Sequence, residues 1–216
     1  TFNLYDYYNE LISNDVTSEV FSIRLRENFK KGQTLEKILD KKEINYKHLL
    51  FQVIHTLATI QKEHPTFVHN NLTISNILVY SINDKRDIKY KFGNDYFELS
   101  DLKFELKIFN FSSAETEEFP TKNKTKNYYH DIFTFLKSLY KFNKFSDVDS
   151  ETKDFLEKVF LKEYKRKSDI KNLFKPSELL DDEYFRSLKI NKNEKISSQQ
   201  KYMKNYSKNK YNRISN

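Results

Sequence analysis

Cysteine and tryptophan are absent from this 216-residue chain, glycine occurs twice, proline three times and methionine once. Without cysteine there is no disulfide scaffold, no thiolate metal site and no cysteine nucleophile. The five histidines show no metal-ligand spacing. No apolar run approaches the roughly 20 residues that span a bilayer, and the N-terminus lacks the basic-then-apolar layout of a signal peptide. We therefore expect an intracellular, cytoplasmic protein without a transmembrane segment.

Positive charge is concentrated at the C-terminal end of the chain. Residues 186–216 carry nine Lys or Arg and one acid, Glu194, which gives this segment a charge of +8 and leaves the rest of the chain, from a total of +7, at −1. The composition after Leu188 predicts a disordered or loosely helical tail over residues 189–216. Such a tail is more often a solvated appendage, but its cations could also bind nucleic acid or an anionic surface.

The remaining pattern predicts an α+β fold. Four segments have apolar residues at helical spacing: 34–40, 46–63, 128–142 and 152–164. Four shorter runs have the composition or alternation of strands: 77–80, 88–92, 96–99 and 104–108. Gly93-Asn94-Asp95 suits the turn of a hairpin between the middle two runs, and Pro65 ends the longest helix. Pro176 is placed to begin a short final helix, and residues 113–127 are predicted to form an exposed loop.

The stretch from His69 to Val79 has the order His-x-Asn-Leu-x-x-x-Asn followed by apolar residues. It resembles the catalytic loop of eukaryotic-type protein kinases, whose usual form is His-Arg-Asp-Leu-x-x-x-Asn. Residues 106–112, Leu-Lys-Ile-Phe-Asn-Phe-Ser, look like the kinase Asp-Phe-Gly element with its preceding strand. Residues 27–39 resemble the hinge and the following helix, and residues 175–185 resemble the segment that closes many kinase C-lobes.

This resemblance covers residues 20–185 and implies a protein-kinase-like fold. A mainly α-helical C-lobe with short β-hairpins would occupy residues 28–188, after a truncated N-lobe whose strands and hinge survive in residues 1–27. The hairpin before the Asn-Phe-Ser element is similar to an insertion of haspin-type kinases and of kinase-like proteins of large DNA viruses. The composition favours the viral group, which would place the protein in the host cytoplasm. Aminoglycoside-phosphotransferase-like kinases share the loop, but the closing segment fits them poorly.

Two N-lobe elements of protein kinases are missing. Kinases cover the phosphates of ATP with a Gly-rich loop and hold them with a lysine on an early strand. Here the first glycine is Gly32, past the hinge, and the only alanines are Ala58 and Ala114, so an Ala-x-Lys strand is absent too. Because the only methionine is Met203, either an initiator was removed before Thr1 or the chain is a fragment.

The resemblance also assigns catalytic and metal-binding positions, and most of them are altered. Asn71 stands at the position of the general base, whose contribution is typically about 10²–10⁴-fold in rate. Thr73 replaces the Lys or His that touches the transferred phosphate. Asn110 replaces the aspartate that binds the principal Mg²⁺, and an amide brings no charge to a hard cation. Asn76, the second metal ligand of the family, is retained, although it could equally be a hydrogen bonder that stabilises the loop.

Four further positions match structural or nucleotide-contacting residues of the family. Leu78 matches the residue under adenine, although a strand leucine is usually part of the core. His69 and Phe111 match residues of the hydrophobic column that links the lobes. Asp131 resembles the aspartate that braces the catalytic loop.

These substitutions favour a catalytically inactive pseudokinase C-lobe that acts as a binding or scaffolding module for a protein partner and uses no cofactor. The first alternative is a Ser/Thr protein kinase, dependent on ATP and Mg²⁺, whose N-lobe is missing from this fragment. The second is a nucleic-acid-binding protein that acts through residues 186–216.

Overall fold

The computed structural model describes residues 32–41, 44–117, 129–142, 148–161 and 174–190. The N-lobe remnant predicted at residues 1–27 and the basic tail beyond residue 190 lie outside these ranges. So do most of the loop predicted at 113–127 and the end of the helix predicted at 152–164. No helix of the described ranges is long and apolar enough to cross a membrane.

The predicted helices are present with small shifts at their ends. They are α2 (Leu35–Lys41), α3 (Tyr46–Glu63), α4 (His130–Tyr140) and α5 (Ser150–Leu156), which continues into the π-helical turn η4 (Glu157–Leu161). The side chain of Asn45 caps α3 by accepting a hydrogen bond from the amide of His48 at 3.0 Å. Pro176 begins the short helix α7 (Pro176–Leu179), as predicted, and η6 (Glu183–Leu188) follows it.

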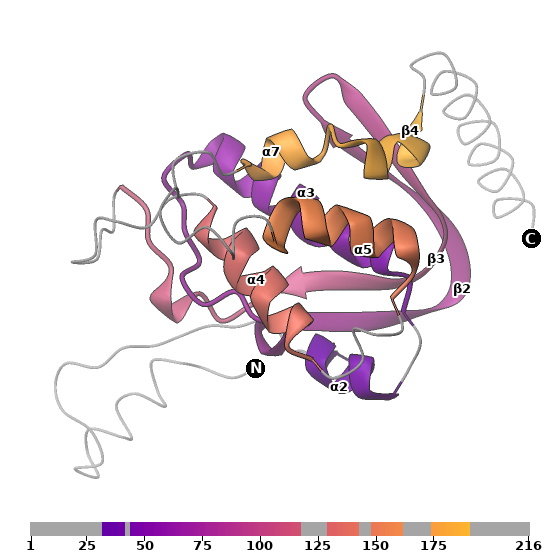
Figure 1. Cartoon of the computed structure of the whole chain (residues 1–216), viewed down its shortest axis with the longest axis horizontal. Helices are drawn as coiled ribbons and strands as arrows, with labels where there is room; N and C mark the ends of the chain where they lie inside the picture. Colours follow the sequence, from indigo (N-terminus) through magenta and orange to yellow (C-terminus); the bar gives the residue numbers. More distant parts are fainter. Residues whose placement is uncertain (1–31, 42–43, 118–128, 143–147, 162–173, 191–216) are drawn as a thin grey trace, which may run out of the picture. The chain divides into compact units, whose positions relative to one another are not determined.

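A four-stranded antiparallel sheet has the order β1 (Gln33–Thr34), β2 (Ile77–Phe92), β3 (Asp95–Ile108) and β4 (Lys189–Ile190). Figure 1 shows β2 and β3 running together as one long, bent ribbon. Gly93, with a φ of 59°, lies in the predicted turn between them. The prediction of separate short strands was wrong, because pairing with the opposite strand continues through the polar residues between the apolar runs. Strand β4, at the expected start of the tail, pairs with Tyr96 and Phe97 of β3.

The middle of the β2–β3 ribbon is irregular. Ser81 pairs with Phe104, whereas the next pair is Arg86 with Leu102, so residues 82–85 of β2 face a single residue of β3. The irregularity continues at Asp101, which has a φ of 52° and donates its backbone N–H to Asp87 Oδ1 at 3.0 Å. Bulges of this kind bend a ribbon and leave backbone groups outside the ladder.

The hydrophobic core lies around α3. The central residue is Phe51, which is fully buried, and its ring centroid lies 5.0 Å from that of Phe97 in β3 and 5.7 Å from that of Phe185 in η6. Phe135 of α4 and Phe155 of α5 are buried in the same core. Helix α3 therefore packs against the sheet and against the closing segment.

His55, half-buried on α3, connects this core to the β2–β3 ribbon. Its ring lies 5.5 Å from Phe51 and 5.1 Å from Tyr90, and Nε2 donates to the carbonyl of Lys91 at 3.2 Å. Burial lowers the pKa of His55 and outweighs the opposing hydrogen bond to Lys91. Burial and the neighbouring Lys47 likewise lower the pKa of His48.

Acidification is therefore expected to destabilise the fold through His55. A histidine whose folded-state pKa is lowered stabilises the fold above its unfolded pKa of about 6.5, and this stability is lost as the pH falls through the folded pKa. The melting temperature should fall between pH values of about 7.5 and 5.5, and it should fall less for His55→Phe. The exposed His64 provides the control, since His64→Gln should keep the wild-type pH profile. Equal pH profiles for wild type and His55→Phe would contradict this expectation.

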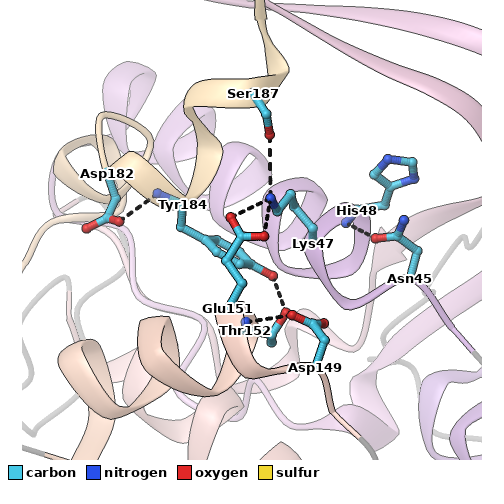
Figure 2. Close-up of polar contacts among 9 residues, drawn as sticks. All are labelled: Asn45, Lys47, His48, Asp149, Glu151, Thr152, Asp182, Tyr184 and Ser187. Atoms are coloured by element: carbon cyan, nitrogen blue, oxygen red, sulfur yellow. Dashed lines mark hydrogen bonds and ion pairs between the residues drawn. The ribbon is translucent and has the colours of Figure 1, made fainter.

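A polar cluster connects the start of α5 and the closing segment to α3 (Figure 2). Lys47 Nζ lies 2.7 Å from Glu151 Oε1 and 4.9 Å from the ring centroid of Tyr184. Thr152 is buried, and its hydroxyl donates to Asp149 Oδ2 at 2.7 Å. The Tyr184 hydroxyl, 2.6 Å from Thr152 Oγ1, must then be the donor in that contact. Burial raises the pKa of Tyr184, which is consistent with a protonated donor.

Thr152→Val should lower the free energy of unfolding by about 1–3 kcal/mol, because it keeps the side-chain shape but leaves the buried Tyr184 hydroxyl without an acceptor. Urea denaturation measures this change. Thr59→Val, at an exposed position of α3, is the matched control and should change stability by less than about 0.5 kcal/mol. Equal effects of the two substitutions would show that the hydrogen bonds of the Thr152 hydroxyl, to Tyr184 and Asp149, contribute no stability.

Candidate functional site

The loop that resembles a kinase catalytic loop joins α3 to β2. It passes through His69, Asn70 and Asn71 and ends in the 3-10 turn η1 (Ile74–Asn76). At its start Val68 pairs with Glu115 as an isolated antiparallel bridge, with N···O distances of 3.0 and 2.8 Å. The loop is therefore attached on one side to the segment that follows the Asn-Phe-Ser element.

Asp131, in the first turn of α4, holds the backbone of this loop. It is fully buried, and its two carboxylate oxygens accept the amides of His69 at 2.7 Å and Asn70 at 2.9 Å. Burial raises the pKa of Asp131, while these two hydrogen bonds and the nearby histidines oppose the shift. Two amides held by one carboxylate fix the loop against α4.

The buried side chain of His69 connects the loop to the Asn-Phe-Ser element. Its Nδ1 accepts the amide of Asn71 at 3.3 Å, so Nε2 carries the proton and donates to the carbonyl of Phe109 at 2.9 Å. The His69 ring lies 5.1 Å from the ring of Phe111, which is 47% exposed. Every polar atom of the imidazole is thus occupied within the protein, and the contacts of His69 are structural.

Three asparagines and a serine form a continuous chain of hydrogen bonds at the expected catalytic positions. Asn76 Nδ2 donates to the carbonyl of Asn71 at 2.7 Å, and Asn110 Nδ2 donates to Asn76 Oδ1 at 3.1 Å. Ser112 Oγ donates to Asn110 Oδ1 at 3.0 Å. Asn110 has a φ of 64°, a left-handed conformation that asparagine tolerates better than most residues. The fold thus brings Asn110 to Asn71 and Asn76 of the loop, although Asn110 is distant from both in the sequence.

Thr73 and Leu78 lie beside this chain of hydrogen bonds. Thr73 donates its amide to the carbonyl of Asn71 at 3.0 Å and accepts the amide of Asn76 at 2.9 Å, so its backbone shapes η1. Leu78 is buried in β2, where it pairs with Thr34 of β1 and Lys107 of β3. For these residues the contacts found are backbone contacts and core packing.

The residues present do not fit a magnesium ion. The side-chain oxygens of Asn76 and Asn110 are neutral, and each already accepts a hydrogen bond, from Asn110 Nδ2 and Ser112 Oγ respectively. Mg²⁺ in proteins is bound through one or two carboxylates. No group of three or more metal-ligating acids, histidines or cysteines occurs in the part of the chain that the structure describes.

Two residues that the sequence did not single out also support the loop. Asn70 adopts a φ of 66° and donates its Nδ2 to the carbonyl of Ser113 at 2.8 Å and to Glu115 Oε1 at 2.6 Å. Ser138 of α4 accepts the amide of Ile74 at 3.1 Å. The tolerance of asparagine for positive φ is a signal that could have identified Asn70. For Ser138 no local pattern exists, because the contact depends on how α4 packs.

Comparison with known proteins finds a viral relative. No protein-family model and no solved structure matches the chain. It is 26% identical over 182 residues to a protein of Acanthamoeba polyphaga mimivirus named "Putative serine/threonine-protein kinase". The match covers 73% of this chain, and the chain spans only 38% of the length of that relative. The similarity supports the kinase-like character that the loop motif indicates and the viral group that the composition favours.

Proposed function

We propose that this chain is a kinase-like binding or scaffolding module, a pseudokinase C-lobe that does not transfer phosphoryl groups. The proposal depends on one observation, the 3.1 Å hydrogen bond from Asn110 Nδ2 to Asn76 Oδ1. Two neutral amides bind each other where the resemblance places a carboxylate and an amide around Mg²⁺. The oxygen that would ligate the metal instead accepts a hydrogen bond.

Asn71, at the general-base position, also supports a module without phosphoryl transfer. Asn71 has an exposed side chain, and an amide cannot take the proton of a substrate hydroxyl at neutral pH. Its backbone carbonyl accepts Asn76 Nδ2 at 2.7 Å, so Asn71 contributes to the hydrogen-bonded loop through its main chain. The loop keeps a defined shape without the groups that phosphoryl transfer uses.

The long β2–β3 ribbon supports a viral, haspin-like form of this module. Between the strand after the loop and the Asn-Phe-Ser element, the chain runs outward along β2 and back along β3. Its position agrees with the insertion that the resemblance implies. An extended ribbon on a kinase-like core offers surface for contact with a protein partner.

ATP with Mg²⁺ should leave the melting temperature of the purified chain unchanged. A ligand that binds only the folded state at 100 times its dissociation constant stabilises by about 2.7 kcal/mol, which a thermal melt detects readily. Thermal melts with ATP alone, Mg²⁺ alone and both together measure the effect. A clear rise that requires both ligands would contradict the pseudokinase proposal.

The alternative is a Ser/Thr protein kinase, dependent on ATP and Mg²⁺, whose N-lobe is encoded upstream of this sequence. The name of the viral relative and the small share of it that this chain spans favour this reading. It requires an upstream reading frame with a Gly-rich loop and an Ala-x-Lys strand. Protein phosphorylation by the longer product, abolished by Asn76→Ala, would support it over the pseudokinase.

A further inference from the structure

A cleft of about 990 Å³ opens at the irregular middle of the β2–β3 ribbon. It is bounded by α2, by the first turn of α3, by the ribbon and by the start of α5. None of the residues of the candidate site lines it. In β2 the lining includes Val79 but not its neighbour Leu78, whose side chain points to the opposite face of the strand. The cleft is therefore separate from the site described above.

The ribbon wall of this cleft offers backbone groups as well as side chains. Residues 82–85 of β2 face only Lys103 of β3, and Ile82, Asn83, Lys85 and Lys103 all line the cleft. Within residues 32–190, as far as the structure describes them, strand β1 pairs with β2 at Leu78 and Val79, and β3 is the strand that runs along the bulge. Backbone groups outside a ladder can pair with an extended segment of another chain.

The floor and the rim of the cleft differ in chemistry. The floor is apolar and is formed by Ile38, Ile44, Val79 and Phe104, all of which are buried. On the rim, two acids are engaged within the protein, because Glu151 pairs with Lys47 at 2.7 Å and Asp149 accepts two hydrogen bonds from Thr152.

The charges that remain on the rim are mainly positive. Lys85 and Lys103 are exposed, have no ion pair within the described ranges and stand on the ribbon wall, with Asp101 as the one further acid. Extended backbone, an apolar floor and two available lysines together match a peptide more closely than a compact small molecule.

We propose that this cleft binds an extended, acidic peptide segment of a protein partner, with an apolar side chain on the floor and carboxylates at Lys85 and Lys103. The proposal rests on the binding role proposed above and gives that role a surface and a ligand chemistry. It makes no use of Asn71, Asn76 or Asn110. A failure of the pseudokinase assignment and a failure of this site therefore give different experimental results.

A phage-displayed library of random peptides, selected on the full chain, provides the probe. Enriched peptides should carry acidic residues on both sides of an apolar residue. Fluorescence anisotropy of an enriched, labelled peptide should show binding that weakens as salt is raised. Lys85→Glu with Lys103→Glu should raise the dissociation constant by roughly tenfold or more, since two exposed ion pairs are replaced by like-charge contacts.

The matched control is Lys62→Glu with Lys141→Glu, which makes the same charge change at two exposed lysines outside the cleft. This double variant should bind the peptide with a dissociation constant within about twofold of the wild-type value, because charges more than a Debye length from the peptide are screened. Equal loss in both double variants, or enrichment of basic peptides, would overturn the proposal. So would tight binding of oligonucleotides through Lys85 and Lys103 in place of peptides.

Discussion

Asp131→Ala is expected to lower the free energy of unfolding by about 3–5 kcal/mol, one of the two largest effects of a single substitution in this protein. The carboxylate accepts the amides of His69 and Asn70 at 2.7 and 2.9 Å while fully buried. Removing it leaves the buried N–H of His69 and the partly buried N–H of Asn70 without acceptors, at up to about 1–3 kcal/mol each, and opens a small cavity. Chemical denaturation monitored by circular dichroism measures the change.

Asp131→Asn is the matched control for this prediction. It keeps the volume and one acceptor oxygen but turns an amide donor toward the second N–H, so roughly half of the alanine effect is expected. A neutral effect of Asp131→Ala would show that the loop does not depend on this carboxylate.

The difference in free energy of unfolding between wild type and Asp131→Asn should depend on pH. Burial raises the folded-state pKa of Asp131 above the unfolded value of about 3.9. In wild type, Asp131 therefore makes its full contribution to the free energy of unfolding below about pH 3.9. Part of this contribution is lost as the pH rises through the folded-state pKa. Because asparagine does not titrate, the stability difference between the two proteins should narrow toward neutral pH. A difference that widens with rising pH would contradict the sign of this shift.

Phe51→Ala is expected to have a similarly large effect, lowering the free energy of unfolding by about 3–5 kcal/mol. The Phe51 ring is fully buried and contacts Phe97 of the sheet and Phe185 of the closing segment. Its loss removes packing between α3 and both neighbours and leaves a cavity that a rigid core fills only partly. Urea denaturation of the variant and wild type gives the difference.

Phe111→Ala is the control at an exposed phenylalanine. With 47% of Phe111 exposed, the substitution removes less buried area and should lower stability by no more than about 1.5 kcal/mol. If Phe111→Ala were as damaging as Phe51→Ala, Phe111 would be packed far more tightly than its exposure indicates.

The helical core was predictable from local pattern. In residues 46–63 the apolar side chains recur at helical spacing, Asn45 can cap the start and Pro65 prevents continuation, and α3 has these bounds in the structure. The turn at Gly93 was also predictable, because few residues adopt its positive φ. Both features depend on residues that are neighbours in the chain.

The ribbon and its cleft were not predictable in the same way. Residues 81–87 carry no strand pattern, yet they belong to β2 because β3 lies alongside them. The bulge depends on how two strands with unequal numbers of residues stay paired at both ends. No local signal in either strand indicates where the mismatch falls.

The sequence by itself supported three predictions: that the loop from His69 to Val79 resembles a kinase catalytic loop, that Asn71 and Asn110 stand at carboxylate positions, and that Asp131 braces the loop. The order of residues suffices for these inferences, because a motif is defined by residue types and their spacing. Only the tertiary structure decided that Asn110 donates to Asn76 and that the imidazole of His69 is fully engaged. It also placed Lys85 and Lys103 on one cleft. Hydrogen-bond direction and side-chain proximity depend on how distant segments pack, and residue spacing along the chain does not contain that information.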